Sequence, residues 1–218
     1  MKPQAGSKGA DASPQSERKH SAILAAATEI FLKSGYLGTN MDEIAARAGV
    51  SKQTVYKHFA TKEALFVEIV SSMTNQAGDT VHTDDPAEPS RAADLAAYLE
   101  DYAFRQVSVV LEPRIMQLRR LVIGEVTRFP ELAKVLYERG PMRAIGMLSS
   151  IFSRLAERGL LDAPDPTLAA THFNWLVMSA PLNQAMLLGD AAIPKPAELR
   201  RHAVEGVRVF LAAYGKRA

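Results

Sequence analysis

Cysteine is absent from this sequence of 218 residues. Its absence excludes a disulfide framework, a thiolate metal site and a cysteine nucleophile. Three common enzyme motifs are missing as well: G-x-S-x-G, the phosphate-binding P-loop and the dinucleotide fingerprint. The five histidines do not have the spacing of metal ligands; they are His20, His58, His82, His172 and His202. We therefore expect a protein that is not an enzyme, with no catalytic residue, no metal and no cofactor.

Long apolar segments are also scarce. Residues 1–20 have no apolar core, which argues against a secretory signal peptide. Residues 167–189 contain no Asp, Glu, Lys or Arg and are long enough to cross a bilayer. That segment nevertheless includes five residues unsuited to lipid: His172, Asn174, Pro181, Asn183 and Gln184. We expect no membrane segment and a cytoplasmic location, which the lack of cysteine also suits.

Charge of one sign is not in large excess. The formal net charge is only +2, which by itself does not indicate a nucleic-acid partner. The distribution is uneven, because residues 1–64 hold nine Lys and Arg against six Asp and Glu, and the remainder holds 17 against 18. The N-terminal end is therefore the more basic, which favours DNA contact there.

The most informative stretch is Thr39–Lys62, TNMDEIAARAGVSKQTVYKHFATK. Asn40 is a good N-cap for a helix over residues 41–48, and Gly49 stands where a helix end favours a left-handed residue. Ser51 can cap a second helix, so that only three residues separate the two helices. This spacing is typical of a helix-turn-helix.

Two lysines occupy awkward places in this stretch. Lys52 and Lys62 each fall in the first turn of a helix, where a cation opposes the helix macrodipole. A DNA phosphate at these helix starts would resolve the conflict, because helix N-termini and lysines both attract it. The alternative is that both lysines are simply solvated.

A first helix is expected over residues 17–34, with a buried stripe of Ile23, Ala27, Ile30 and Phe31. Gly35 is expected to stop it. The residues before it, 1–16, are rich in small and polar side chains and are expected to form a disordered arm. This arm either reaches DNA beside the main contact or is merely solvated.

The segment TNMDEIAARAGVSKQTVYKHFATKEALF resembles the N-terminal domain of TetR-type transcriptional regulators, and the preceding KHSAILAAATEIFLKSGYLGTN resembles the first helix of that family. The resemblance covers about residues 17–70. It implies a three-helix DNA-binding domain over residues 17–64, in which the second helix of the motif reads DNA.

Base-edge contacts are expected from Gln53 and Thr54, because glutamine can pair with adenine and the threonine methyl can touch the thymine methyl. Lys57 reaches either a base or a phosphate. By resemblance, Tyr56, His58 and Lys62 hold phosphates. Lys52, Thr39 and Asn40 are expected to add further phosphate contacts. For Tyr56 and His58 a structural role in packing is the alternative.

The remaining sequence predicts helices only. Their expected ranges are 62–77, 90–111, Pro113 to about 128, 130–139, 141–159, 167–188 and 196–214. Residues 78–90 are expected to form a loop, and Ser90 to cap the helix that follows. The segments LRRLVIGEVTRFPELAKVLYERGP and RLAERGLLDAPDPTLAATHFNWLV resemble the C-terminal half of AefR-like TetR regulators, near the multidrug-efflux repressors. The expected fold is all-α, with residues 65–218 forming a ligand-binding and dimerisation domain.

A ligand cavity would need adaptable apolar side chains, and methionine and aromatic residues provide them. The candidates are Phe104, Met116, Met147, Phe152, Phe173, Trp175, Met178 and Met186. Each is open to a second interpretation, as an ordinary core residue. Four polar residues either orient a ligand or cross the subunit interface: His172, Asn174, Asn183 and Gln184. Arg119 and Arg120 either bind an anionic group or form ion pairs on the surface.

Dimerisation is expected because one helix-turn-helix reads only a few base pairs, whereas two related by symmetry read a palindrome. The last two helices are the expected interface, including Val204, Val207, Phe210 and Leu211. The sequence thus predicts a dimeric repressor of a double-stranded DNA operator, released by a small apolar or amphipathic inducer. The alternative is a DNA-binding regulator without a small-molecule inducer, which is constitutive, controlled by a partner, or an activator.

Overall fold

A computed structural model describes residues 13–83 and 87–216. The chain divides into two compact units, and the division falls between Ile69 and Val70, inside a helix that contributes to both. We call them the head and the body. Residues 1–12 of the predicted arm over residues 1–16 lie outside the described residues. The fold is all-α, as predicted. The described ranges contain no strand, and their β-type backbone pairing is limited to one isolated bridge between Leu161 and Gly215.

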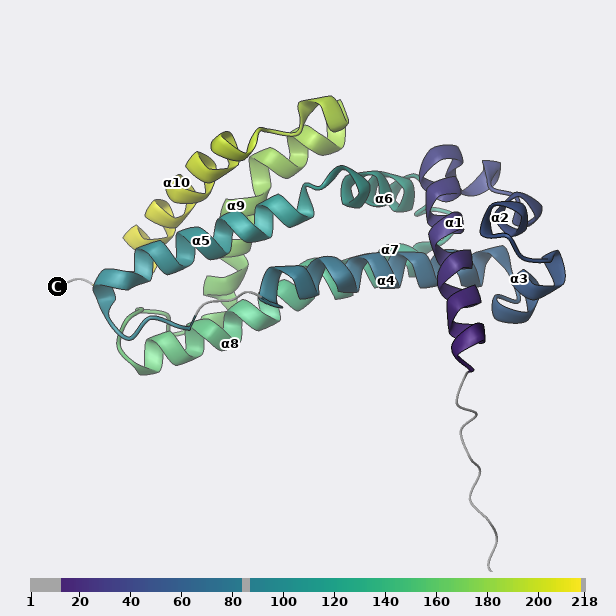
Figure 1. The fold of residues 1–218 in the computed structure, drawn as a ribbon. Coiled ribbons are helices and arrows are strands. Elements are labelled where there is room, and N and C mark those ends of the chain that lie inside the picture. The colour runs from purple at the N-terminus through teal and green to yellow at the C-terminus, as the bar shows by residue number, and fades with distance from the viewer. Residues whose placement is uncertain (1–12, 84–86, 217–218) are drawn as a thin grey trace, which may run out of the picture. The chain divides into compact units, whose positions relative to one another are not determined.

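The head is built from three helices and the start of a fourth (Figure 1). Their bounds are α1 Pro14–Gly38, α2 Met41–Ala48, α3 Lys52–His58 and α4 Lys62–Thr83. Asn40 caps α2 by accepting from the amide of Asp42 at 2.9 Å, and Ser51 caps α3 by accepting from the amide of Thr54 at 3.1 Å. Gly49 ends α2 in the left-handed conformation, with φ of 66°. The predicted caps and turn are confirmed.

Helix α1 starts earlier than the expected residue 17. It begins at Pro14, because Ser13 provides an N-cap and proline suits the first turn of a helix. The expected stop at Gly35 is a break in helical conformation, with φ of 70° and ψ of 177°, after which a short turn continues to Gly38. Such a φ favours glycine, which has no Cβ.

The head has a small apolar core that joins its helices. The predicted stripe on α1 is buried, and Ile44 of α2 and Val55 of α3 are fully buried beside it. The ring of Phe31 stacks on that of Phe66 of α4, with 4.9 Å between centroids, and Tyr36 lies 5.3 Å from Phe66. The start of α4 is therefore an integral part of the head, as a domain this small requires.

The body contains the rest of α4 and the remaining helices (Figure 1). Their bounds are α5 Ala92–Val110, α6 Pro113–Gly124, α7 Pro130–Tyr137, α8 Arg143–Glu157, α9 Pro166–Leu188 and α10 Pro196–Tyr214. A π-helical segment, η1 Glu138–Met142, joins α7 to α8, and a short 3-10 turn, η2 Asp190–Ala192, follows α9. Helix α9 packs against α8 and α10, and α10 also packs against α5.

The centre of the body core is aromatic. Phe152 of α8, Phe173 of α9 and Phe210 of α10 are fully buried, and their ring centroids lie 5.1–5.6 Å apart. Tyr102 of α5 lies edge-on to Phe173 at 6.2 Å. Four helices therefore each contribute a large ring to one core.

Three predicted helix bounds in the body were wrong. Helix α4 does not end near residue 77 but continues to Thr83, because Val81 is buried in the body core and Asp79 pairs with Arg143 of α8. The cap position of α5 is Arg91, not Ser90, and it makes no side-chain capping bond. Helix α6 ends at Gly124 instead of continuing to about 128. None of the helices in the described ranges has the length and hydropathy needed to span a bilayer.

Candidate DNA-binding surface and ligand cavity

Helix α3 presents most of the predicted DNA-contact residues on its outer side. Gln53, Tyr56 and Lys57 are exposed, with Tyr56 retaining 43% of its surface. Thr54 is half-buried, and its hydroxyl shares a hydrogen bond of 2.9 Å with that of Ser51. Because Val55 is buried beneath them, these residues are held on a short, capped and anchored helix.

Lys52 has a partner within the head. Its ammonium group lies 2.8 Å from a carboxylate oxygen of Asp42, and the hydrogen bond and charge of Asp42 raise the pKa of Lys52. Both side chains are more than half exposed. The pair offsets the unfavourable position of this lysine at the start of α3 in the free protein, and it leaves the ammonium accessible to a phosphate.

Lys62 and Thr39 are held by the head itself. The ammonium of Lys62 donates to the carbonyl oxygens of Tyr36 and Thr39, each at 2.9 Å, and lies 4.6 Å above the Tyr36 ring. The Thr39 side chain is 4% exposed and its hydroxyl donates to the Gly35 carbonyl at 2.7 Å. The Thr39 hydroxyl is therefore buried and engaged within the head, and the expected phosphate contact of Thr39 stays a prediction. Asn40 beside it is exposed.

His58 lies at the end of α3 beside a second histidine. The ring of His20 from α1 is 5.8 Å from that of His58 and 4.9 Å from that of Phe59. Burial lowers the pKa of His58, and the nearby positive groups of His20, Lys57 and Lys19 lower it further. The lowered pKa favours the neutral ring of His58 near physiological pH in the free protein.

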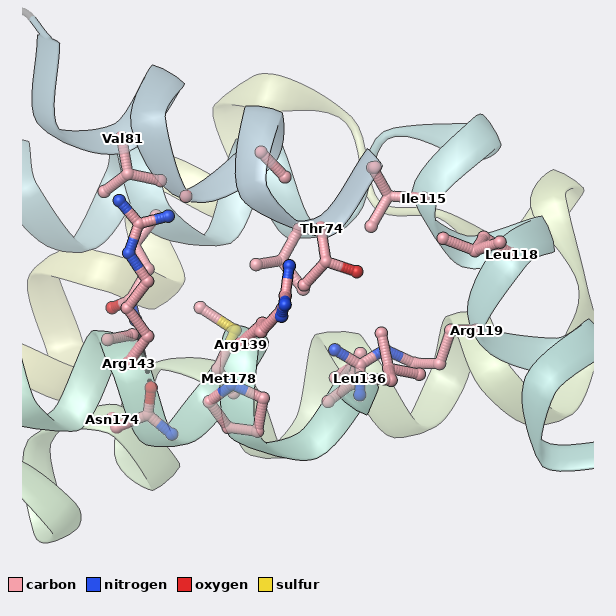
Figure 2. Close-up of a pocket in the computed structure, with 18 of the residues that line it drawn as sticks. Thr74, Val81, Ile115, Leu118, Arg119, Leu136, Arg139, Arg143, Asn174 and Met178 are labelled. Carbon is pink, nitrogen blue, oxygen red and sulfur yellow. Dashed lines mark hydrogen bonds between the residues drawn. The ribbon is translucent and has the colours of Figure 1, made fainter. Parts of the chain in front are cut away.

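The body contains a cavity lined by residues of α4, α5, α6, α7, η1, α8 and α9 (Figure 2). It measures about 80 Å³, counted as the space that the centres of water molecules can occupy. Apolar side chains dominate its walls, among them Val81, Ile115, Leu118, Leu136, Met178 and Leu182. Helix α4 contributes Thr74, Ala77 and Gly78 as well. Such a concave, apolar site is the usual setting for a small ligand.

Only two of the predicted cavity residues line this cavity, namely Trp175 and Met178. The other six do not line it, and their role in binding a ligand stays a prediction. Met116, Phe152 and Phe173 are fully buried in the core, where the helices pack against one another. Met186 and Phe104 pack against the outside of that core, and Met147 is half-buried on α8. Residue type alone does not distinguish a cavity wall from ordinary core.

The polar groups of the cavity come largely from residues that the sequence did not single out. Gln106 of α5 is 3% exposed and donates from Nε2 to Oδ1 of Asn174 at 3.0 Å. Asn174 had been named as a possible ligand contact, and both residues line the cavity. The sequence does contain a signal that could have identified Gln106: it is a polar residue on the otherwise apolar face of α5 formed by Tyr102, Ala103 and Val107.

The two arginines of α6 have different surroundings. Arg120 pairs with Asp190 and donates to the Ala185 carbonyl at 2.9 Å, so it ties α6 to the end of α9. Arg119 lines the cavity, and burial lowers its pKa. Arg139 and Arg143 also line the cavity. No group of three metal-ligating residues lies together in the described ranges.

Helices α9 and α10 expose apolar side chains next to a shallow hollow. Trp175, Ser179, Val209 and Ala213 line it, and Trp175 and Val209 retain 43% and 45% of their surfaces. His172 at its edge shares a hydrogen bond of 2.6 Å with the Tyr214 hydroxyl.

Two of the expected interface residues are placed differently. Val207 and Phe210 are fully buried in the core of their own body, and Phe210 lies in the wall of the shallow hollow on α9 and α10. Asn183 and Gln184 are exposed on α9, and Gln184 lines a separate hollow formed with the start of α10.

Two family models match the sequence. The model for bacterial regulatory proteins of the tetR family matches residues 23–69, which lie in the head. The model for the C-terminal domain of AefR-like transcriptional repressors matches residues 97–216, more than half of the chain.

Comparison with individual proteins also finds transcriptional regulators. A TetR-family transcriptional regulator from Mesorhizobium loti has a solved structure that is 41% identical, with 94% of this chain and 100% of that chain covered and a TM-score of 0.86. The flavonoid-responsive regulator FrrA is 31% identical, with 93% and 100% covered and a TM-score of 0.74. The transcriptional activator FasR of Mycolicibacterium smegmatis is 41% identical over 69 residues, which are 32% of this chain and 31% of FasR.

Proposed function

The chain belongs to the TetR family of DNA-binding transcriptional regulators, and from that premise we propose that it is a dimeric repressor released from a palindromic operator by a small apolar or amphipathic ligand. The observation that supports this proposal most strongly is the course of helix α4. Lys62 in its first turn is bonded to the head, and Thr74, Gly78 and Val81 further along line the cavity. One helix thus connects a DNA-reading unit to a ligand site, and a ligand that favours one position of α4 shifts a pre-existing equilibrium.

A dimer is supported by the exposed apolar residues of α9 and α10 around Trp175 and Val209. An interface built on these helices would bury these residues, and exposed apolar patches commonly mark sites of protein–protein contact. Two heads related by a twofold axis would reach successive major grooves roughly 34–36 Å apart or a multiple of that distance, so the operator would be palindromic. The site of action would be the cytoplasm, where bacterial DNA lies.

On the DNA, Gln53 and Thr54 read base edges and Lys57 contacts a base or a phosphate. Their exposure on a capped α3 supports these roles, since base contacts specify and phosphate contacts position. Lys52, Tyr56, His58 and Asn40 would contact phosphates around α3; Lys62 would act chiefly by holding the connection from α1 to α2.

An apolar or amphipathic ligand is supported by the walls of the cavity and by the similarity to FrrA, which is described as flavonoid-responsive. The repressor assignment is supported by the match of residues 97–216 to AefR-like repressors. The alternative of an activator is favoured by one observation, the similarity of the head to that of FasR.

Gel-shift titration with the DNA upstream of the chain's own gene tests the proposal directly. We expect a shifted complex whose stoichiometry, measured by light scattering, is one dimer for each palindrome. A panel of apolar compounds should contain at least one that weakens this complex. A monomer at micromolar concentration, or the same shift with unrelated DNA, would contradict the dimeric operator model.

Gln53→Ala is expected to change sequence preference more than overall affinity. A bidentate contact from glutamine to adenine discriminates by about 1–3 kcal/mol, so its loss relaxes one position of each half-site. Selection of operators from a randomised pool, wild type against variant, measures this change. Retention of the full preference by Gln53→Ala would show that the side chain does not read a base.

Lys57→Gln and His58→Gln should affect salt dependence differently at about pH 7.5. Each cationic phosphate contact adds roughly 0.9 to the slope of log affinity against log salt concentration. Lys57→Gln therefore lowers the slope for each head, provided that Lys57 contacts a phosphate. His58→Gln is expected to leave it unchanged, because a pKa lowered from the ordinary histidine value favours the neutral ring at this pH. Equal losses of slope in both variants would mean that His58 is charged when bound.

A further inference from the structure

The body cavity is apolar in most of its lining, yet the ionisable groups that line it are all cationic. Three arginines line it, Arg119, Arg139 and Arg143, and none of its described lining residues is Asp or Glu. The Arg143 guanidinium is paired with Asp79 of α4 at 2.6 Å, so its charge is matched. The other two are not matched by a carboxylate of the lining. The cavity therefore offers excess positive charge within apolar walls.

Arg119 is the arginine of the described cavity lining that has a buried donor without a hydrogen-bond partner. Its Nε atom is buried and has no hydrogen-bond partner among the described residues. In Figure 2 its side chain extends from α6 toward the middle of the cavity. Burial lowers its pKa, which shows that the surroundings disfavour the charge, although a guanidinium stays protonated. A buried donor without an acceptor is unfavourable, so an anionic group in the cavity would supply the acceptor that Arg119 Nε has not found among the described residues.

A second unsatisfied group faces the same space. The bond between Gln106 and Asn174 uses one donor and one acceptor, and it leaves Gln106 Oε1 and Asn174 Nδ2 buried without partners. Both residues are at most 3% exposed, and both line the cavity. Reversing both amides would still leave one buried donor and one buried acceptor. The pair is therefore able to bond a hydroxyl or a carbonyl group of a ligand.

We propose that the cavity binds an amphipathic organic anion. This proposal rests on the proposed function, because the anion is taken to be the inducer. Its anionic oxygens, those of a carboxylate in the simplest case, pair with Arg119 in the forked geometry that guanidinium groups favour. Its apolar body lies against Ile115, Leu136 and Met178. A hydroxyl or carbonyl on that body bonds Gln106 and Asn174. The chemistry that selects the ligand is thus charge as well as apolar shape.

Matched pairs of probes test this inference on the full-length protein. Each pair is a carboxylate and its neutral primary amide: naphthalene-2-carboxylate, cinnamate and octanoate with the corresponding amides. Calorimetric titration gives the dissociation constants for wild type, Arg119→Gln, Arg119→Lys and the control Arg201→Gln. Arg201 is exposed on α10 and lines none of the hollows described above, so its variant removes the same charge elsewhere.

Wild type is expected to bind at least one carboxylate about tenfold tighter than its amide, since pairing with a buried guanidinium is stronger than a neutral hydrogen bond. Arg119→Gln should lose this preference while binding the amide within about threefold of wild type. Arg119→Lys should keep part of the preference, and Arg201→Gln all of it. Thermal melting of unliganded Arg119→Gln should occur at or above the wild-type temperature, because a partly buried guanidinium, whose Nε has no partner in the described ranges, has been removed.

Equal binding of carboxylates and amides by wild type would overturn the inference, as would a preference that survives in Arg119→Gln. Failure of every probe to bind at about 1 mM would also overturn it. Operator binding by the unliganded protein, measured in parallel, separates the two proposals. If the operator is bound, the anion inference alone has failed; if it is not, the proposed function has failed.

Discussion

Phe152→Ala is expected to lower the free energy of unfolding of the body by about 3–5 kcal/mol, the usual range for removing a fully buried phenylalanine. Phe152 has no exposed surface, and its ring lies 5.1 Å from Phe210 and 5.6 Å from Phe173. These three rings come from α8, α9 and α10. Because each helix is held by further contacts, the space left by the ring cannot close without moving one of them.

Phe104→Ala is the matched control, because it makes the same substitution at a half-buried position. The Phe104 ring packs on the outside of the core and faces the Arg200 guanidinium at 4.0 Å. Its loss should cost less than half as much as that of Phe152, since a partly exposed site leaves little cavity. Urea denaturation followed by the fluorescence of Trp175, the single tryptophan of the chain, reports on the body. Equal costs in the two variants would refute the assignment of Phe152 to the core.

The head was the more predictable unit because its signals are local. The caps at Asn40 and Ser51 and the left-handed Gly49 depend on residues within a few positions of one another. The apolar stripe of α1 likewise follows from helical spacing alone. Long-range partners were not predictable from spacing: Asp42 pairs with Lys52, and the Lys62 ammonium bonds the carbonyls before α2.

The body was predictable in class and helix order, but its cavity was not. Phe152 and Met178 both belong to the buried core, and only the packing of the helices makes Met178 a wall of the cavity as well. The end of α4 depended on Asp79 and Val81, whose partners lie far away in the sequence. Arg119 could be named from the sequence, whereas the missing partner of its Nε among the described residues became visible only in the packed helices.

Lys62→Met is expected to weaken operator binding at every salt concentration while leaving the salt slope unchanged. The ammonium group of Lys62 donates to the carbonyls of Tyr36 and Thr39, so two of its three donors are used inside the head. Hydrogen bonds to charged groups contribute about 1.5–3 kcal/mol each, and the half-buried carbonyls would lose their partner. We expect the head to lose about 2–4 kcal/mol of stability in total.

The functional consequence follows from where those carbonyls are. Tyr36 lies at the end of α1 and Thr39 directly precedes the N-cap of α2, and α2 carries the turn that orients α3. Without the lysine this connection loosens, and the ordering of α3 must then take place on binding DNA. Affinity falls for all DNA sequences because α3 is no longer preorganised in its bound geometry. The free energy of ordering α3 does not depend on the release of counterions, so the salt slope stays the same.

Hydrogen exchange of the full-length protein measures the effect on the head, through the amides of Ile44 and Val55, and filter binding over a range of salt gives the slope. Lys52→Met is the matched control: it removes an exposed lysine whose partner is the exposed Asp42. That variant should leave the exchange of these amides unchanged and lower the slope, because Lys52 remains accessible to a phosphate. The reverse pattern, with the slope lowered by about 1 in Lys62→Met and unaffected exchange, would show that Lys62 is a phosphate contact and not a structural tie.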